Sequence, residues 1–148
     1  VEEIKLGFGV MLIHFPTGDV LGHEWGWGGA VQRWAFKTED AYLATILRTL
    51  DETGLRATTL IIVTSDHGGY KTSHGGDLPQ EMTIPWIISG PGVIPGPLTS
   101  FVQTTDTAAT AAYMLGLSLP AEWDGVPVYE AFGQPTPIRV SEACQQTR

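Results

Sequence analysis

Cysteine is almost absent from the 148-residue sequence, in which Cys144 is the only one. A lone cysteine excludes an internal disulfide framework and a zinc site built from several thiolates. Because it lies near the polar C-terminus, we expect Cys144 to be a thiol without a role in chemistry. Any metal bound by this chain would therefore be held by histidines and carboxylates.

Basic residues are also scarce. Eight Lys and Arg stand against 16 Asp and Glu, which gives a formal net charge of −8. Proteins that bind nucleic-acid polymers usually carry clustered Lys and Arg, so we expect no such partner. An acidic chain can still bind a phosphate ester when metal ions supply the positive charge.

Long apolar runs are missing as well. The longest stretches, 9–13 and 60–63, fall far short of the roughly 20 residues that a membrane-spanning helix needs. Residues 1–5 include neither the initiator Met nor the features of a signal peptide. The chain length suits one domain with its own core, and the sequence leaves the oligomeric state and the compartment open.

Strand-like and helix-like segments alternate along the chain. The run 58–64 is rich in β-branched residues without alternation, as expected for a central strand covered on both faces. Apolar residues between 30 and 53 recur at helical period, and Gly54 is placed to end that helix. This alternation predicts an α/β fold, with sites at the carboxyl ends of parallel strands. The other expected elements are strands over 6–13, 84–89 and 101–102 and a helix over 105–115.

Three of the four histidines follow expected strand ends in glycine-rich loops. Asp19 and His23 leave the first strand through a turn, Asp66 and His67 follow 58–64 directly, and His74 lies in the next loop. Imidazole with carboxylate suits zinc, manganese or iron, whereas an all-oxygen set would indicate calcium or magnesium. We therefore predict a divalent-metal site, with zinc or manganese as the first choice.

Other interpretations remain open for single residues. An Asp–His pair taken alone is also typical of capping or hydrogen bonding at a strand end. His14 continues an apolar run and is expected in the core or in a hydrogen bond, and Trp86 is expected in the core. Lys71 either contacts a phosphate oxygen or is a solvated loop residue. Trp25 and Trp27 either pack against the following helix or line a substrate cleft.

Segments 19–26, 61–68 and 82–92 together resemble the alkaline phosphatase superfamily, and within it the type I phosphodiesterase and nucleotide pyrophosphatase branch. Segments 105–110 and 115–117 resemble the helix that follows in these proteins. The resemblance implies a partial alkaline-phosphatase-like three-layer sandwich, in which helices flank a mostly parallel central sheet.

The resemblance also implies two divalent metal ions, zinc first and manganese second. Asp19 and His23 would bind the first ion, and Asp66 with His67 would bind the second. His74 resembles the later histidine that returns to the first ion, at a short interval closer to that of phosphopentomutase-like members. Lys71 is the one candidate for substrate binding.

The family's Ser or Thr nucleophile and an earlier Asp ligand have no counterpart in residues 1–148. The resemblance therefore implies that this single domain is the C-terminal half of a larger catalytic domain and could be inactive alone. The implied activity is metal-dependent hydrolysis of phosphodiester, nucleotide pyrophosphate or phosphomonoester bonds in a small molecule. A sulfatase or phosphomutase of the same superfamily, a non-catalytic metal-binding domain and a metal-free α/β domain are the alternatives. Only the resemblance suggests a periplasmic or extracellular location.

Overall fold

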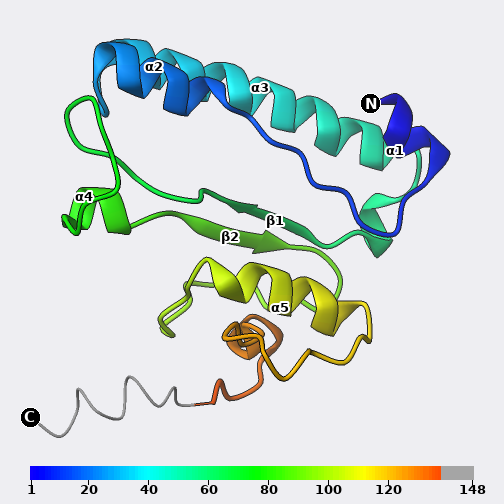
Figure 1. The fold of residues 1–148 in the computed structure, drawn as a ribbon. Helices are drawn as coiled ribbons and strands as arrows, with labels where there is room; N and C mark the ends of the chain where they lie inside the picture. The colour runs from blue at the N-terminus through cyan, green and yellow to red at the C-terminus, as the bar shows by residue number, and fades with distance from the viewer. Residues whose placement is uncertain (138–148) are drawn as a thin grey trace, which may run out of the picture. The chain divides into compact units, whose positions relative to one another are not determined.

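The computed structural model describes residues 1–137, and Cys144 lies outside the described residues. These residues form two compact units (Figure 1). The first unit comprises Val1–Thr59 with Thr64–Pro85, and the second comprises Leu60–Val63 with the chain from Trp86 onward.

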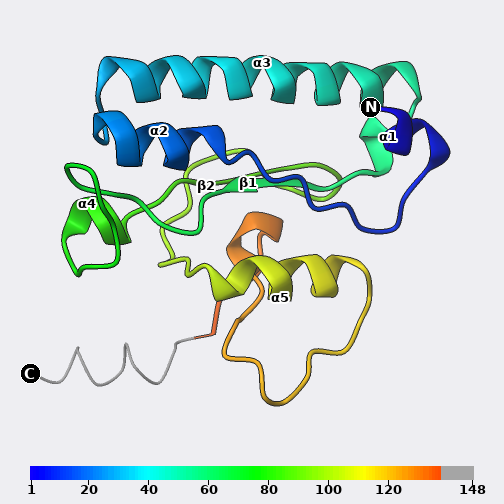
Figure 2. The same ribbon diagram turned by 45° about the horizontal axis from the view of Figure 1, so that its top comes forward.

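The first unit is built on two neighbouring helices, α2 (Thr17–Trp25) and α3 (Ala30–Glu52), which lie side by side in both views (Figures 1 and 2). The predicted helix between 30 and 53 is confirmed. It ends where predicted, because Gly54 takes a φ of 73° and the amide of Leu55 donates to the carbonyl of Leu50 at 2.9 Å. The shorter helices of this unit are α1 (Glu2–Leu6), the 3-10 helix η1 (Arg56–Thr58) and α4 (Pro79–Met82).

The second unit holds the sheet and helix α5 (Thr105–Met114). Strands β1 (Ile61–Thr64) and β2 (Trp86–Ser89) confirm the strands predicted over 58–64 and 84–89, and α5 confirms the helix predicted from 105. Asp106 is buried and joins α5 to the following loop, since its Oδ1 accepts a hydrogen bond from the amide of Val126 at 2.9 Å. The short 3-10 helix η2 (Tyr129–Phe132) follows.

The predicted three-layer sandwich with a mostly parallel central sheet is wrong. Residues 1–137 contain a single sheet, and it has two strands, β1 and β2. Segments 6–13 and 101–102 are not strands: α1 ends at Leu6, and 10–16 have no regular structure. A strand needs a hydrogen-bonding neighbour, which an apolar run cannot supply by itself. In 6–13, Val10 and Leu12 are 70% and 94% exposed.

Two smaller expectations also change. His14 is exposed, so its predicted place in the core is wrong. Trp86 is half-buried, and its indole N–H donates to Oγ1 of Thr107 at 3.0 Å. No helix within residues 1–137 is long and apolar enough to cross a membrane.

Candidate metal centre

Helix α2 carries the first two predicted ligands. Asp19 and His23 are one helical turn apart and therefore share a face, which brings Oδ1 of Asp19 to 3.5 Å from Nε2 of His23. The sequence suggested a turn after a strand here, but the same four-residue spacing converges equally well on a helix. The side chains are 44% and 43% exposed, so the site is open to solvent.

The start of α2 is fixed on α3 by two polar side chains. The amide of Gly18 donates to Oε1 of Glu39, and Nε2 of Gln32 donates to the carbonyl of Gly18, both at 3.0 Å. Gln32 is only 2% exposed. A Cβ at Gly18 would lie 2.6 Å from the ring of Phe36, so glycine permits this close approach. These contacts set the position of Asp19, the next residue.

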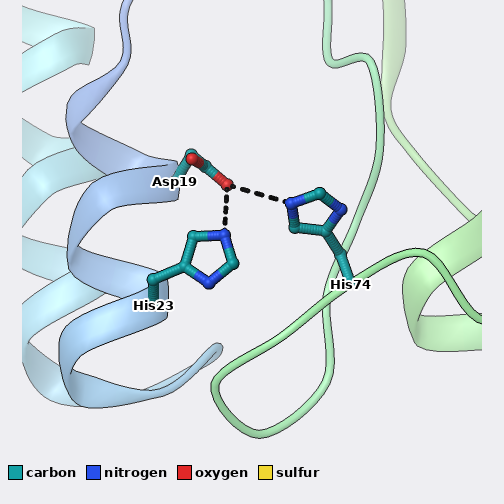
Figure 3. Close-up of side chains that lie close together, drawn as sticks. All are labelled: Asp19, His23 and His74. Atoms are coloured by element: carbon teal, nitrogen blue, oxygen red, sulfur yellow. Dashed lines mark ion pairs between the residues drawn. The ribbon is translucent and has the colours of Figure 1, made fainter.

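Loops of the same unit bring two more imidazoles to Asp19. The Nε2 atoms of His67 and His74 each lie 3.8 Å from the same Oδ1. Figure 3 shows His23 and His74 pointing toward the carboxylate of Asp19 from opposite segments. The rings of His67 and His74 stack with centroids 3.6 Å apart. Ligand atoms of Asp19, His23 and His74 all lie within 4.8 Å of one another.

Oδ1 of Asp19 is buried and has no hydrogen-bond partner among the described residues. The three imidazole nitrogens around it lie 3.5 to 3.8 Å away, which is beyond normal hydrogen-bond length. A buried anionic oxygen without a donor is costly. Two ligands bound about 2.1 Å from one zinc ion at a tetrahedral angle lie about 3.4 Å apart, close to the spacing found here. These residues therefore fit a divalent cation.

Backbone carbonyls fix the orientation of two rings. Nδ1 of His23 lies 2.9 Å from the carbonyl oxygen of Thr72, and Nδ1 of His67 lies 2.7 Å from that of Gly68. A carbonyl can only accept, so Nδ1 carries the proton in each ring. Nε2 is therefore the nitrogen of each ring that faces Asp19 and is placed to bind a metal.

Asp66 lies beside this cluster. Its Oδ2 is 3.6 Å from Nε2 of His67, and its side chain is 84% exposed. Burial raises the pKa of Asp66, but hydrogen bonds from backbone amides and from Ser65, with the charge of His67, outweigh this and lower the pKa below its ordinary value. Asp66 is therefore ionised at neutral pH. It adjoins His67 but does not join the group formed by Asp19, His23 and His74.

Lys71 occupies a tight turn in which Tyr70 and Ser73 exchange backbone hydrogen bonds of 2.9 and 3.1 Å. Its φ is 55°, an uncommon value for a residue with a Cβ. The ammonium group lies 5.4 Å from the ring centroid of Tyr70. The backbone of this turn contacts the site, because the carbonyl of Lys71 accepts a hydrogen bond from the amide of Trp27 at 2.7 Å.

The sequence predicts only helix packing or a substrate cleft for Trp27, and it does not single out Gln32 and Glu81. Trp27 contacts the rings of His23 and His74, Gln32 holds α2, and Glu81 accepts a hydrogen bond from the amide of Gly76 at 3.1 Å. One signal was available in the sequence, since Gln32 lies three residues before the apolar Ala35 and so shares its helical face. The contacts of Trp27 and Glu81 arise only when separate segments meet.

One family model and several known proteins are similar to this chain. Residues 7–81 match the model of the family described as type I phosphodiesterase / nucleotide pyrophosphatase. The 2,3-bisphosphoglycerate-independent phosphoglycerate mutase of Rhodopirellula baltica is 28% identical over 137 residues, covering 88% of this chain and 24% of the relative. A phosphopentomutase of Methylobacterium sp. is 43% identical over 67 residues, covering 45% and 16%.

A further relative is the arylsulfatase K of Xenopus laevis, which is 30% identical over 92 residues. The match covers 58% of this chain and 17% of the relative. The chain thus spans about a quarter or less of the length of these curated relatives.

Proposed function

Because the chain belongs to the type I phosphodiesterase / nucleotide pyrophosphatase family of the alkaline phosphatase superfamily, we propose that it supplies metal ligands to a hydrolase of phosphate esters. Its substrates would be phosphodiester, nucleotide pyrophosphate or phosphomonoester bonds in small molecules. The observation that carries the proposal is the convergence of three imidazole nitrogens on one buried oxygen of Asp19.

The proposed ligands form two sets. Asp19, His23 and His74 would hold one divalent ion, while Asp66 and His67 would hold a second, with zinc as the first choice and manganese as the second. Support comes from the common approach of the first set and from the 3.6 Å between Asp66 and His67. Bound divalent cations in such a site supply positive charge to phosphate oxygens and favour ionisation of an attacking hydroxyl.

The protein's own groups prepare these ligands. The carbonyls of Thr72 and Gly68 hold two imidazoles with Nε2 facing Asp19. Asp66 is kept ionised at neutral pH by its hydrogen bonds. The orientation of these two rings and the negative charge of Asp66 both favour binding of a cation.

We further propose that residues 1–148 act within a larger catalytic domain, since they span 24% of the phosphoglycerate mutase that they match. The phosphorylated Ser or Thr nucleophile remains a prediction from the resemblance. A phosphomutase is the second candidate, favoured by the similarity to a phosphoglycerate mutase and a phosphopentomutase. A hydrolase passes the phosphoryl group to water, whereas a mutase returns it to a hydroxyl of a phosphorylated metabolite.

The test uses the full-length protein, stripped of metal by chelation and then reloaded with zinc or manganese. A hydrolase releases p-nitrophenolate from bis-p-nitrophenyl phosphate or p-nitrophenyl phosphate, only when metal is present. A mutase instead isomerises a pentose phosphate or a phosphoglycerate, which phosphorus NMR detects. Turnover of p-nitrophenyl sulfate alone would identify a sulfatase. Metal-loaded protein that turns over no phosphate ester would refute the hydrolase.

A further inference from the structure

Trp27 forms one wall of the histidine cluster. Its ring centroid lies 5.0 Å from that of His23, in an edge-on arrangement with an interplanar angle of 88°. It lies 5.9 Å from the ring of His74, at 67°. The rings of His23 and His74 are 5.0 Å from each other, so the three rings form one cluster.

Glycines make room for the indole. A Cβ at Gly69 would lie 2.1 Å from Cε2 of Trp27, and a Cβ at Gly22 would lie 2.9 Å from the same ring. One glycine belongs to α2 and the other follows His67, so the indole is held between the two segments that supply the ligands. The backbone is fixed too, because the amide of Trp27 donates to the carbonyl of Lys71 at 2.7 Å.

The indole itself offers no atom to a cation, since its N–H is only a donor. What it can do is restrict rotation of the imidazoles. The ring of His23 has one hydrogen bond, to Thr72, about which it can still pivot. The ring of His74 stacks on the ring of His67 and also lies close to the ring of Trp27. A rigid wall against both rings keeps each Nε2 directed at Asp19.

We infer that Trp27 is a positioning residue of the metal centre, which fixes the rings of His23 and His74 for binding of a divalent cation. The inference rests on the proposed function, because it requires the cluster to bind metal. It predicts that Trp27 sets the affinity and the coordination geometry while contributing no ligand.

The experiment titrates metal-free full-length protein with cobalt(II), whose visible absorption reports coordination geometry, and then displaces the cobalt with zinc. We expect Trp27→Ala to raise the Kd for metal about 10- to 100-fold, the range typical of residues that orient metal ligands, and to shift the visible band. Trp25→Phe is the matched control, because Trp25 is 66% exposed and its indole N–H donates to Glu24. It should keep the wild-type Kd and spectrum.

If Trp27→Ala fails to fold, Trp27→Phe serves as the second variant in the same titration. A phenyl ring fills only part of the space that the indole occupies between Gly22 and Gly69. We therefore expect a rise in the Kd for metal of about threefold or more and a shifted band. Wild-type affinity and spectrum in both Trp27 variants, or in Trp27→Phe when only that variant folds, would overturn the inference while leaving the metal centre intact. Wild-type protein that binds neither cobalt nor zinc would instead refute the proposed function itself.

Discussion

Oδ1 of Asp19 lies 3.8 Å from Nε2 of His74, although Asp19 belongs to helix α2 and His74 to the glycine-rich loop before α4. The two groups are too far apart for a hydrogen bond, and Oδ1 of Asp19 is buried with no hydrogen-bond partner among residues 1–137. A cation between them satisfies both. Their approach is therefore a property of the folded unit that metal binding should stabilise.

Zinc should raise the stability of the full-length protein through this cluster. A ligand that binds only the folded state adds about 2.7 kcal/mol at a concentration 100 times its Kd. Thermal unfolding with zinc, and again with a chelator, measures the difference. His74→Ala should abolish most of the shift, whereas His14→Ala should keep it, because His14 is an exposed histidine outside the cluster. Equal shifts in both variants would contradict the assignment.

Asp19→Asn should separate stability from metal binding. Because Oδ1 of Asp19 is buried without a hydrogen-bond partner among residues 1–137, a neutral amide removes the cost of an uncompensated anion there. We expect the melting temperature of the metal-free variant to stay the same or rise slightly, with a gain in the free energy of unfolding of less than about 1 kcal/mol. Its affinity for zinc should fall at least about 10- to 100-fold.

Asp40→Asn is the control for this variant, since Asp40 is an exposed carboxylate on α3. It should change neither quantity. If Asp19→Asn lowered the melting temperature of metal-free protein by several degrees, Oδ1 would have a protein hydrogen-bond donor in solution. The unpaired oxygen would then no longer support a bound cation at this position.

Much of the local structure was predictable because the signals for it are local. The helical period of 30–53 and the position of Gly54 define α3 without reference to the rest of the chain. The β-branched run 58–64 similarly predicts β1. Segment 6–13 is also largely apolar but has no strand beside it, and pairing depends on distant residues that periodicity does not report.

The ligand residues were predictable for a different reason. Asp19, His23, Asp66, His67 and His74 are chemically distinctive and flanked by glycine, so their spacing points to one site even though α2 was expected to be a turn. The roles of Trp27 and Gln32 could not be predicted in this way, because they follow only from contacts made when α2, α3 and the loop after β1 meet.

Gly68→Ala should destabilise the loop that carries His67. A Cβ at Gly68 would lie 2.1 Å from the carbonyl oxygen of Gln80, a backbone atom that cannot rotate away. Overpacking of this kind costs about 1–3 kcal/mol, and we expect the upper part of that range. Gly9→Ala is the matched control, because nothing lies within 4 Å of a Cβ there. Denaturant unfolding compares the two, and equal effects would contradict the close approach at Gly68.

Glu130 should make the second unit sensitive to acid. Side-chain and backbone hydrogen bonds from Ser100 and Thr99 lower the pKa of the Glu130 carboxyl to about 2 from 4.5. Its oxygens accept from the amides of Ser100 and Thr99 at 2.7 and 2.8 Å. A folded-state pKa below the unfolded one stabilises the fold above the unfolded value. That contribution is lost as the pH falls from about 4.5 to about 2.

Amide hydrogen exchange of Thr99 and Ser100 measures this effect directly. Protection relative to pH-matched unfolded chain should weaken between pH 5 and pH 2.5 in the wild type. Glu130→Gln should exchange fast at both pH values, and Glu3→Gln, a change at an exposed residue of α1, should behave like the wild type. If protection in the wild type did not depend on pH, the Glu130 carboxylate would not stabilise the loop at Thr99 and Ser100.

Asp66→Ala tests the division of the ligands into two sets. Asp66 approaches His67 and lies outside the group of Asp19, His23 and His74, so its removal should vacate only the second site. Elemental analysis of zinc-loaded full-length protein should find two ions in the wild type and one in the variant. Because both cations act on the same phosphate in a two-metal site, turnover should fall at least about 100-fold even though one ion stays bound.

His23→Ala should remove the other ion with a similar loss of turnover. A variant at Asp66 that kept both ions and wild-type turnover would contradict the division into two sets, and the 84% exposed carboxylate of Asp66 would then be a solvated side chain and not a metal ligand.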